Sequence, residues 1–249
     1  MYGMPTEIDV RADGGLRIIT LNRPDDLNAV NDALHVGLAR IWEELNEDVD
    51  ARAAVITGAG RAFSAGGDFN YLDELRNDEA LRQKTIKHGR DLVIGMVRCR
   101  IPVVAAVNGP AVGLGCSLAA LSDIVYMAET AFFADPHVSI GLVAADGGAA
   151  GLAVADQHVA RQGVRVHRSA DQAARALELG MANHVVADPL AEAIACAKKI
   201  MELPQQALEA TKRLMNIQLE KSVMASLDYA NLSEYVSFGT ADFNTIVDG

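Results

Sequence analysis

Near its N-terminal end the chain changes its hydrophobic period. Apolar and polar residues alternate over residues 8–20, on either side of an Asp-Gly-Gly turn, which is typical of a β-hairpin. Over residues 30–45 the apolar residues instead recur every three or four positions, the period of an amphipathic helix. The pattern therefore predicts a hairpin followed by a helix.

Three short apolar runs follow, each with the length of a buried strand: residues 53–60, 101–109 and 122–129. Continuous Val/Ile runs that alternate with helical stretches are typical of a sheet covered by helices. From Ala170 onward the pattern is almost wholly helical, apart from a late strand around His184. These patterns predict an α/β protein, with a core over residues 1–190 and a helical C-terminal region over residues 191–249.

The composition excludes several classes of protein. The formal net charge is −11, which argues against nucleic-acid binding because a basic surface is needed to neutralise phosphates. Three widely spaced cysteines, with no Cys-x-x-Cys pair, predict neither a disulfide framework nor a metal site. No signal-peptide pattern is visible, and no apolar run approaches the ~20 residues of a membrane span. We therefore expect a cytoplasmic protein with no membrane, metal or nucleic-acid partner.

Two glycine-containing turns are the first candidates for chemistry. They are "GRAFSAGGDF" at 60–69 and "NGPAVGLGCSLAA" at 108–120, each directly after a predicted strand. Small residues at the expected start of a helix leave backbone N–H groups without intrahelical acceptors. Two such groups directed at one oxygen form an oxyanion hole. The alternative is that the glycines only permit tight turns and close packing.

Together with their flanking sequences, these turns resemble the crotonase (enoyl-CoA hydratase/isomerase) superfamily. The resemblance runs from "GLRIITLNRPDDLNAV" through "FSAGGD", "IPVVAAVNGPAVGLGCSLAALSDI" and "ALELGMANHVV" to "PQQALEATKRLMN". It implies a ββα-superhelix whose helical C-terminal region forms a homotrimer or a dimer of trimers.

The resemblance also implies an acyl-CoA substrate, with coenzyme A bound as part of that thioester and no permanently bound cofactor. The enolate-like thioester oxygen would be held by the backbone N–H groups of Ala65 and Leu114. By the same resemblance, the residues near the CoA are Leu27, Asn28, Ala29, Gly67, Asp68, Phe69 and Gly113.

The chain departs from the superfamily's hydratases at both of their catalytic glutamates. One of these positions holds Ser117 and the other holds His137, in "DPH". Serine cannot act as a carboxylate base at neutral pH, so a two-glutamate hydratase mechanism is not expected. Asp146 follows His137 by nine residues. This spacing resembles the loop of 6-oxocamphor hydrolase, a superfamily member that cleaves a carbon–carbon bond with a His–Asp pair.

The sequence therefore predicts that His137 is a general base acting on water or an α-proton, with Asp146 orienting its imidazole. The first interpretation is an enoyl-CoA hydratase/isomerase-type lyase in which a histidine replaces the glutamates. The alternatives are a C–C hydrolase of β-dicarbonyl compounds and a non-catalytic acyl-CoA-binding protein. The remaining alternative is that neither residue is catalytic, with His137 as a loop histidine and Asp146 as the N-cap of the next helix.

Other polar residues carry weaker expectations. His35, His88 and His184 are predicted to be structural or exposed. Lys212 and Arg213 are predicted to contact the nucleotide phosphates of a CoA bound to a neighbouring subunit.

Residues 151–168, "GLAVADQHVARQGVRVHR", break the resemblance, because the superfamily has an apolar helix at this place. Suitable codons for these residues, translated in a frame shifted by one nucleotide, can encode a sequence close to the family pattern. We therefore hypothesise a compensated frameshift, either in the gene or in the recorded sequence; a divergent, more polar helix is the alternative. An intact mass that matches the printed chain to within a dalton would exclude a recording error.

Overall fold

The computed structural model describes residues 2–146 and 172–248, so the segment of the frameshift hypothesis lies outside the described residues. The predicted hairpin is confirmed as β1 (Ile8–Asp13) and β2 (Leu16–Leu21), which pair antiparallel. Gly14 in its two-residue turn has a φ of +59°, a conformation that glycine adopts without steric cost.

The predicted buried strands form the middle of the main sheet. They are β3 (Ala53–Gly58), β4 (Val103–Val107) and β6 (Ile124–Ala128). Among the described residues, the strand order is β1-β2-β3-β4-β6-β8, with β8 at His184–Val186, and every pairing except β1–β2 is parallel. The mixed α/β fold with a mainly parallel sheet is therefore confirmed.

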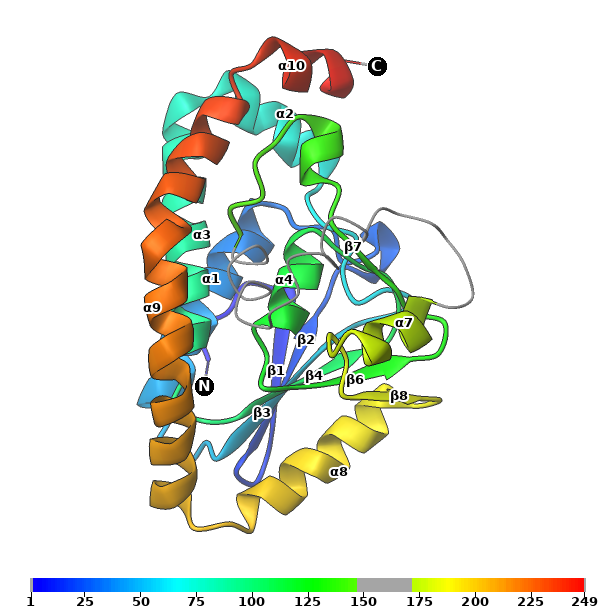
Figure 1. Cartoon of the computed structure of the whole chain (residues 1–249), viewed down its shortest axis with the longest axis vertical. Coiled ribbons are helices and arrows are strands. Elements are labelled where there is room, and N and C mark those ends of the chain that lie inside the picture. Colours follow the sequence, from blue (N-terminus) through cyan, green and yellow to red (C-terminus); the bar gives the residue numbers. More distant parts are fainter. Residues whose placement is uncertain (1, 147–171, 249) are drawn as a thin grey trace.

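Helices cover both faces of this sheet, which explains why its strands are apolar throughout. Adjacent residues of β2 point to opposite faces: Ile19 packs in the cluster with α1 (Asp32–Glu47) and α3 (Glu79–Arg98), while Ile18 packs against α8 (Pro189–Met201). Because α8 packs on the main sheet, it shares a core with the preceding residues (Figure 1). The division predicted at residue 190 therefore does not separate two hydrophobic cores.

The remaining C-terminal helices extend beyond the sheet. The long helix α9 (Gln205–Ser237) runs beside α3 along one side of the molecule, and α10 (Ala241–Val247) packs against α2 (Phe69–Asn77) at the upper end (Figure 1). The smaller elements are η1 (Pro24–Asp26), β5 (Ala111–Val112), α4 (Leu114–Ala120), β7 (Phe133–Ala134), η2 (His137–Ile140) and α7 (Gln172–Glu178).

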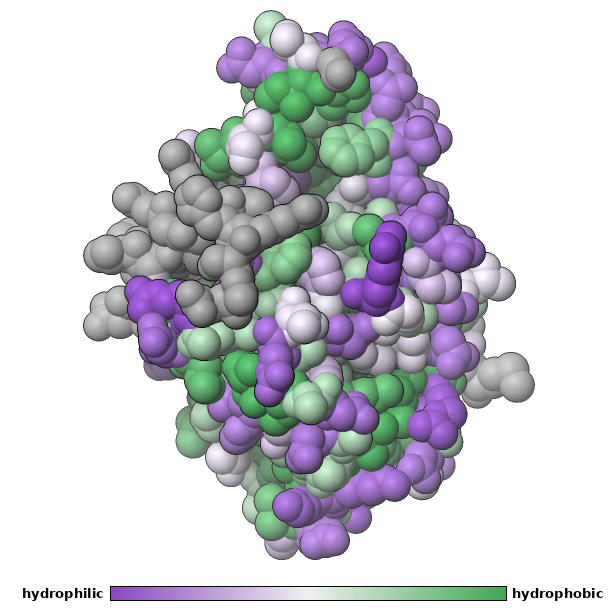
Figure 2. Space-filling view, turned by 90° about the vertical axis from the view of Figure 1, so that its right-hand side faces the viewer, coloured by the Kyte–Doolittle hydropathy of each residue, from purple (hydrophilic) through white to green (hydrophobic). Residues whose placement is uncertain are grey.

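Hydrophobic and hydrophilic residues are interspersed on the face shown in Figure 2, with apolar side chains gathered toward the upper end, which holds α2 and α10, and again in the lower part of the face. A buried apolar cluster lies at that end and includes Leu72, Leu75, Phe238 and Phe243. In the ranges that the structure describes, no helix is both long and apolar enough to cross a membrane.

Candidate active site

A cavity of about 340 Å³ opens between the glycine turns, η2 and helices α2, α3 and α9. It brings together most of the site residues predicted from sequence. The predicted residues that line it are Ala65, Gly67, Phe69, Gly113, Leu114, His137 and Asp146. The others, Leu27, Asn28, Ala29 and Asp68, are not part of its lining.

The second glycine turn has the geometry that was predicted for it. Gly113 is the N-cap of α4, and Leu114 is the first helical residue. Gly113 has a φ of +51°, and a Cβ on it would lie 3.5 Å from His137 Cε1 and 3.8 Å from Gly66 Cα. The first N–H groups of a helix have no intrahelical acceptor. The backbone N–H of Leu114 therefore lies at a helix start, on the cavity wall and close to His137.

The first glycine turn differs from the prediction. Helix α2 begins only at Phe69, with Asp68 as its N-cap, so Ala65 is not at a helix start. The N–H of Ala65 donates to the Leu27 carbonyl at 3.0 Å. The Ala65 N–H is therefore already hydrogen-bonded within the protein, and it can reach a thioester oxygen only as a shared donor.

His137 is held between two carboxylates. It opens the short 3₁₀-helix η2, and its Nδ1 lies 2.5 Å from Oδ1 of Asp135, which also accepts the His137 backbone N–H at 3.2 Å. On the other side of the ring, Nε2 lies 3.5 Å from Oδ2 of Asp146. The carboxylate hydrogen-bonded to the imidazole is thus Asp135, whereas Asp146 was predicted to orient it. The "DPH" sequence indicates this Asp135–His137 contact, since Asp side chains commonly accept a hydrogen bond from the backbone N–H two residues later.

These carboxylates change the charge of the imidazole. Burial opposes the charged form of His137, but the negative charges of Asp146 and Asp135, with a smaller contribution from Glu234 once it ionises, outweigh it and raise its pKa to about 10. Burial acts to raise the pKa of Asp135 as well, yet its hydrogen bond to His137 lowers it overall. At neutral pH the ring is therefore an imidazolium with a proton on each nitrogen, which makes it a proton donor rather than a free base.

Ser117 and Asp146 form a second contact in the site. The Oγ of Ser117, which is buried in α4, lies 2.6 Å from Oδ1 of Asp146. By the sequence resemblance, Ser117 is expected at the position of one glutamate of the superfamily's hydratases and His137 at the position of the other. The Asp146 carboxylate lies close to both of these residues.

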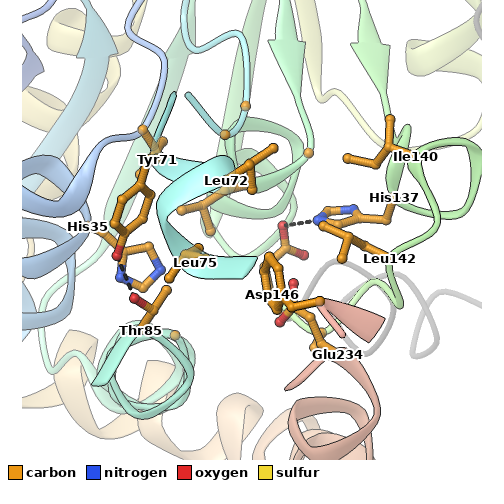
Figure 3. A pocket seen from close by; sticks show the side chains of 18 of the residues that line it. His35, Tyr71, Leu72, Leu75, Thr85, His137, Ile140, Leu142, Asp146 and Glu234 are labelled. Atoms are coloured by element: carbon orange, nitrogen blue, oxygen red, sulfur yellow. Dashed lines mark hydrogen bonds and ion pairs between the residues drawn. The ribbon is translucent and has the colours of Figure 1, made fainter. Parts of the chain in front are cut away.

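Helix α9 contributes two lining residues that the sequence analysis did not find, Glu234 and Asn231. Burial raises the pKa of Glu234 to about 8, so this side chain mostly holds a proton at neutral pH. Figure 3 shows Glu234 on the same side of the cavity as His137 and Asp146. No local motif marks Glu234, because its place depends on how α9 packs against the rest of the chain.

The residues predicted near CoA that do not line the cavity make structural contacts instead. Asn28 is fully buried, donates to the carbonyls of Ala59 and Ala62 at 2.9 Å, and accepts from the Arg23 N–H. Asp68 caps α2 and pairs with Arg23 at 3.0 Å. Together these bonds fix the loop that precedes α1 against the first glycine turn.

Lys212 likewise makes its hydrogen bonds inside the protein. Its ammonium donates to the Ile101 carbonyl and to Asp123, both at 2.7 Å, and the residue is buried. The prediction that Lys212 contacts nucleotide phosphates conflicts with this arrangement. Across the parts of the chain that the structure describes, no group of His, Cys, Asp or Glu side chains is arranged to hold a metal ion.

Comparisons with known proteins agree with this fold. The profile of the enoyl-CoA hydratase/isomerase family matches residues 11–244. A probable enoyl-CoA hydratase of Mycobacterium tuberculosis is 32% identical over 235 residues, which cover 94% of this chain and 90% of the relative. The mitochondrial enoyl-CoA hydratase of Pongo abelii is 31% identical over 227 residues, covering 90% and 77%. A crystal structure of an enoyl-CoA hydratase/isomerase from Mycobacterium paratuberculosis superimposes with a TM-score of 0.96 at 67% identity, with 99% of each chain covered.

The family match spans most of the hairpin, both glycine turns, the His137 loop and all of α9. On this evidence the chain belongs to the enoyl-CoA hydratase/isomerase family, within the crotonase superfamily.

Proposed function

We propose that this protein is an enzyme that adds water to, or moves protons on, an unsaturated acyl-CoA thioester, with His137 and Asp146 in place of two glutamates. The observation that carries this proposal is the contact of Asp146 with both Ser117 and His137, at 2.6 and 3.5 Å. It supplies one carboxylate and one proton donor where the superfamily's hydratases have their two glutamates.

In the proposed hydration, Asp146 accepts a proton from water while the water oxygen bonds to Cβ of the enoyl thioester. The electron pair of the double bond moves onto the thioester oxygen, and the enolate then takes the Nε2 proton of His137 at Cα. The His137–Asp146 contact allows the proton on Asp146 to return to Nε2, which restores the starting charges. The protonation state of His137 favours this assignment over the general base expected from the sequence.

The enolate oxygen requires backbone donors. In the proposal the Leu114 N–H, at the start of α4, is the main donor. Ala65 supplies a second N–H only as a shared donor, since the same group also bonds the Leu27 carbonyl. The CoA arm would enter beside Gly67 and Phe69, which line the cavity mouth with an exposed Phe69 ring.

The experiment is turnover of a panel of enoyl-CoA esters by the wild type, His137→Gln and Asp146→Asn. A loss of ~10²-fold or more in either variant is expected, the usual scale for removing a general acid or base. In D₂O, the product should carry deuterium at Cα. His184→Gln makes the same change at an exposed histidine outside the cavity and should keep wild-type rates. Equal rates in all four proteins would contradict the assignment.

A second candidate function is hydrolysis of a carbon–carbon bond in a β-dicarbonyl compound. The observation that favours it is the histidine between carboxylates, since an imidazolium can protonate the carbanion that leaves when the bond breaks. β-Ketoacyl-CoA esters and free β-diketones in the same panel separate the candidates. Binding of CoA esters without turnover of any compound would instead favour a non-catalytic acyl-CoA-binding protein.

We also propose a homotrimer or dimer of trimers. Supporting it, α9 exposes large apolar side chains that a partner subunit would cover: Leu214, Met215, Tyr229, Leu232 and Val236. Light scattering on the purified protein measures the assembly directly.

A further inference from the structure

The cavity has a second polar end, away from His137. His35 from α1, Tyr71 from α2 and Thr85 from α3 line it there, and Leu72 and Leu75 lie between them and the His137 side (Figure 3). Thr85 donates its hydroxyl hydrogen to the Leu81 carbonyl at 2.9 Å. The Tyr71 hydroxyl oxygen lies 2.5 Å from the Thr85 hydroxyl oxygen and 3.4 Å from Oδ1 of Asp32, so Tyr71 already has polar partners within the protein.

Two buried polar atoms in the cavity wall lack hydrogen bonds within the described ranges. One is Nδ1 of His35, a residue only 9% exposed, and the other is the side-chain amide nitrogen of Asn231, 6% exposed. Native proteins rarely leave buried polar groups without a partner, because the loss of hydration is not compensated. Both residues line one cavity, so a ligand within it can supply the missing partners.

Gly89 of α3 also lines the cavity, next to His35. His35 Cε1 lies 4.0 Å from the position that a Cβ on Gly89 would take. The Arg90–Asp228 ion pair joins α3 to α9 one residue after Gly89 and three residues before Asn231. The glycine therefore leaves open space beside the His35 ring, on the part of α3 that lies along the Asn231 turn of α9.

We propose that His35 and Asn231 form a distal subsite that binds an uncharged oxygen function, a hydroxyl or a keto group, on the acyl chain of the substrate. This inference rests on the proposed thioester chemistry and specifies its substrate class. The acyl group passes the apolar wall of Leu72 and Leu75 first and ends on the polar groups.

The subsite suits a neutral ligand rather than a carboxylate. Burial, together with the nearby His88, lowers the pKa of His35 to about 4, so its ring is uncharged at neutral pH and offers one donor and one acceptor. The nearest lysine, Lys84, is already paired with Asp32 at 2.9 Å. A plain alkyl chain would fill the cavity but leave both polar atoms without partners, so it should bind less well.

Titration calorimetry with saturated acyl-CoA esters tests the subsite without requiring turnover. The probes are one medium-chain ester and equal-length esters with a hydroxyl or a keto group at successive carbons beyond Cβ. We expect wild-type protein to prefer one oxygenated ester by about tenfold, which is about 1.4 kcal/mol. His35→Phe and Asn231→Leu should each remove the preference while still binding the plain ester. His35→Gln, which keeps a donor and an acceptor, should retain part of it.

His88→Phe is the matched control, because His88 neighbours His35 but does not line the cavity; it should leave the preference unchanged. Thermal melts confirm that each variant is folded. Equal affinity of the wild type for all esters, or a preference that survives in His35→Phe and Asn231→Leu, overturns the subsite. A preference without turnover of any enoyl-CoA overturns the proposed reaction alone. Failure to bind any acyl-CoA overturns both.

Discussion

Replacing Asp135 by asparagine removes one negative charge from the surroundings of His137 and changes little else. Asparagine has nearly the same shape, and its Oδ1 can still accept the His137 Nδ1–H that now lies 2.5 Å away. What changes is the stability of the imidazolium. The variant therefore tests whether neighbouring carboxylates hold His137 in its charged form.

The expected change in the His137 pKa depends on how exposed the Asp135 side chain is. A charge within hydrogen-bond distance shifts a pKa by about 1–3 units. The Asp135 side chain is 35% exposed, so water screens it and the lower end applies. We expect the pKa of His137 to fall from about 10 to about 9 in Asp135→Asn. Asp146 is 12% exposed, so Asp146→Asn should lower this pKa further.

The same shift affects stability. The folded pKa of His137 lies above the ordinary value near 6.5. Its ion pairs therefore contribute fully to the free energy of unfolding below about pH 6.5, and this contribution is lost as the pH rises through about 10. One unit is about 1.4 kcal/mol of unfolding free energy. Asp135→Asn should therefore be less stable than the wild type by about that amount at pH 6, and by less above pH 10.

Histidine ring NMR signals, followed against pH and assigned by comparison with His137→Gln, measure this pKa. Asp32→Asn is the control: it breaks an ion pair with Lys84 and should leave the His137 titration unchanged. A wild-type His137 that titrates near pH 6.5, or one that does not respond to Asp135→Asn, would refute the charge argument. His137 would then be assigned as the general base expected from the sequence, and no longer as a general acid.

Three further changes test the structure around the site. Gly113→Ala places a Cβ at a φ of +51°, 3.5 Å from the His137 ring; it should cost about 1 kcal/mol in urea unfolding and lower turnover. Asn28→Ala removes the side-chain partner of the Ala59 carbonyl and of the Arg23 N–H and should reduce the unfolding free energy by about 1–3 kcal/mol; a cost below the error of the measurement would contradict its structural role. Lys212→Met should destabilise by a similar amount, because the Asp123 carboxylate loses its positively charged partner. Its CoA affinity by calorimetry should match the wild type, and weaker binding would restore the phosphate-contact hypothesis.

Much of the fold could be predicted because it depends on short-range patterns. The alternation in the hairpin, the period of α1 and the apolar runs of β3, β4 and β6 each express burial that repeats every two or three to four residues. The helix start at Leu114 was predictable for the same reason, since it needs only a strand, a glycine and a helix in succession.

The candidate site could be predicted only where its contacts are local. Asp135 lies two residues from His137, so its hydrogen bond is implied by the sequence and was overlooked. The partner of Ala65 is a carbonyl on Leu27, and no local pattern indicates that this carbonyl reaches the first glycine turn. The same holds for the contact between Ser117 and Asp146.

The sequence by itself thus determined the hairpin, the first helix and the buried strands of the sheet, and by resemblance it predicts that His137 stands at the position of a catalytic glutamate. Only the tertiary structure decided the charge of that histidine, because the charge depends on carboxylates supplied by three separate parts of the chain. It also decided that α9 brings Glu234 and Asn231 to the cavity. The physical reason is that electrostatic and hydrogen-bond partners act through space, while hydrophobic periodicity acts along the chain.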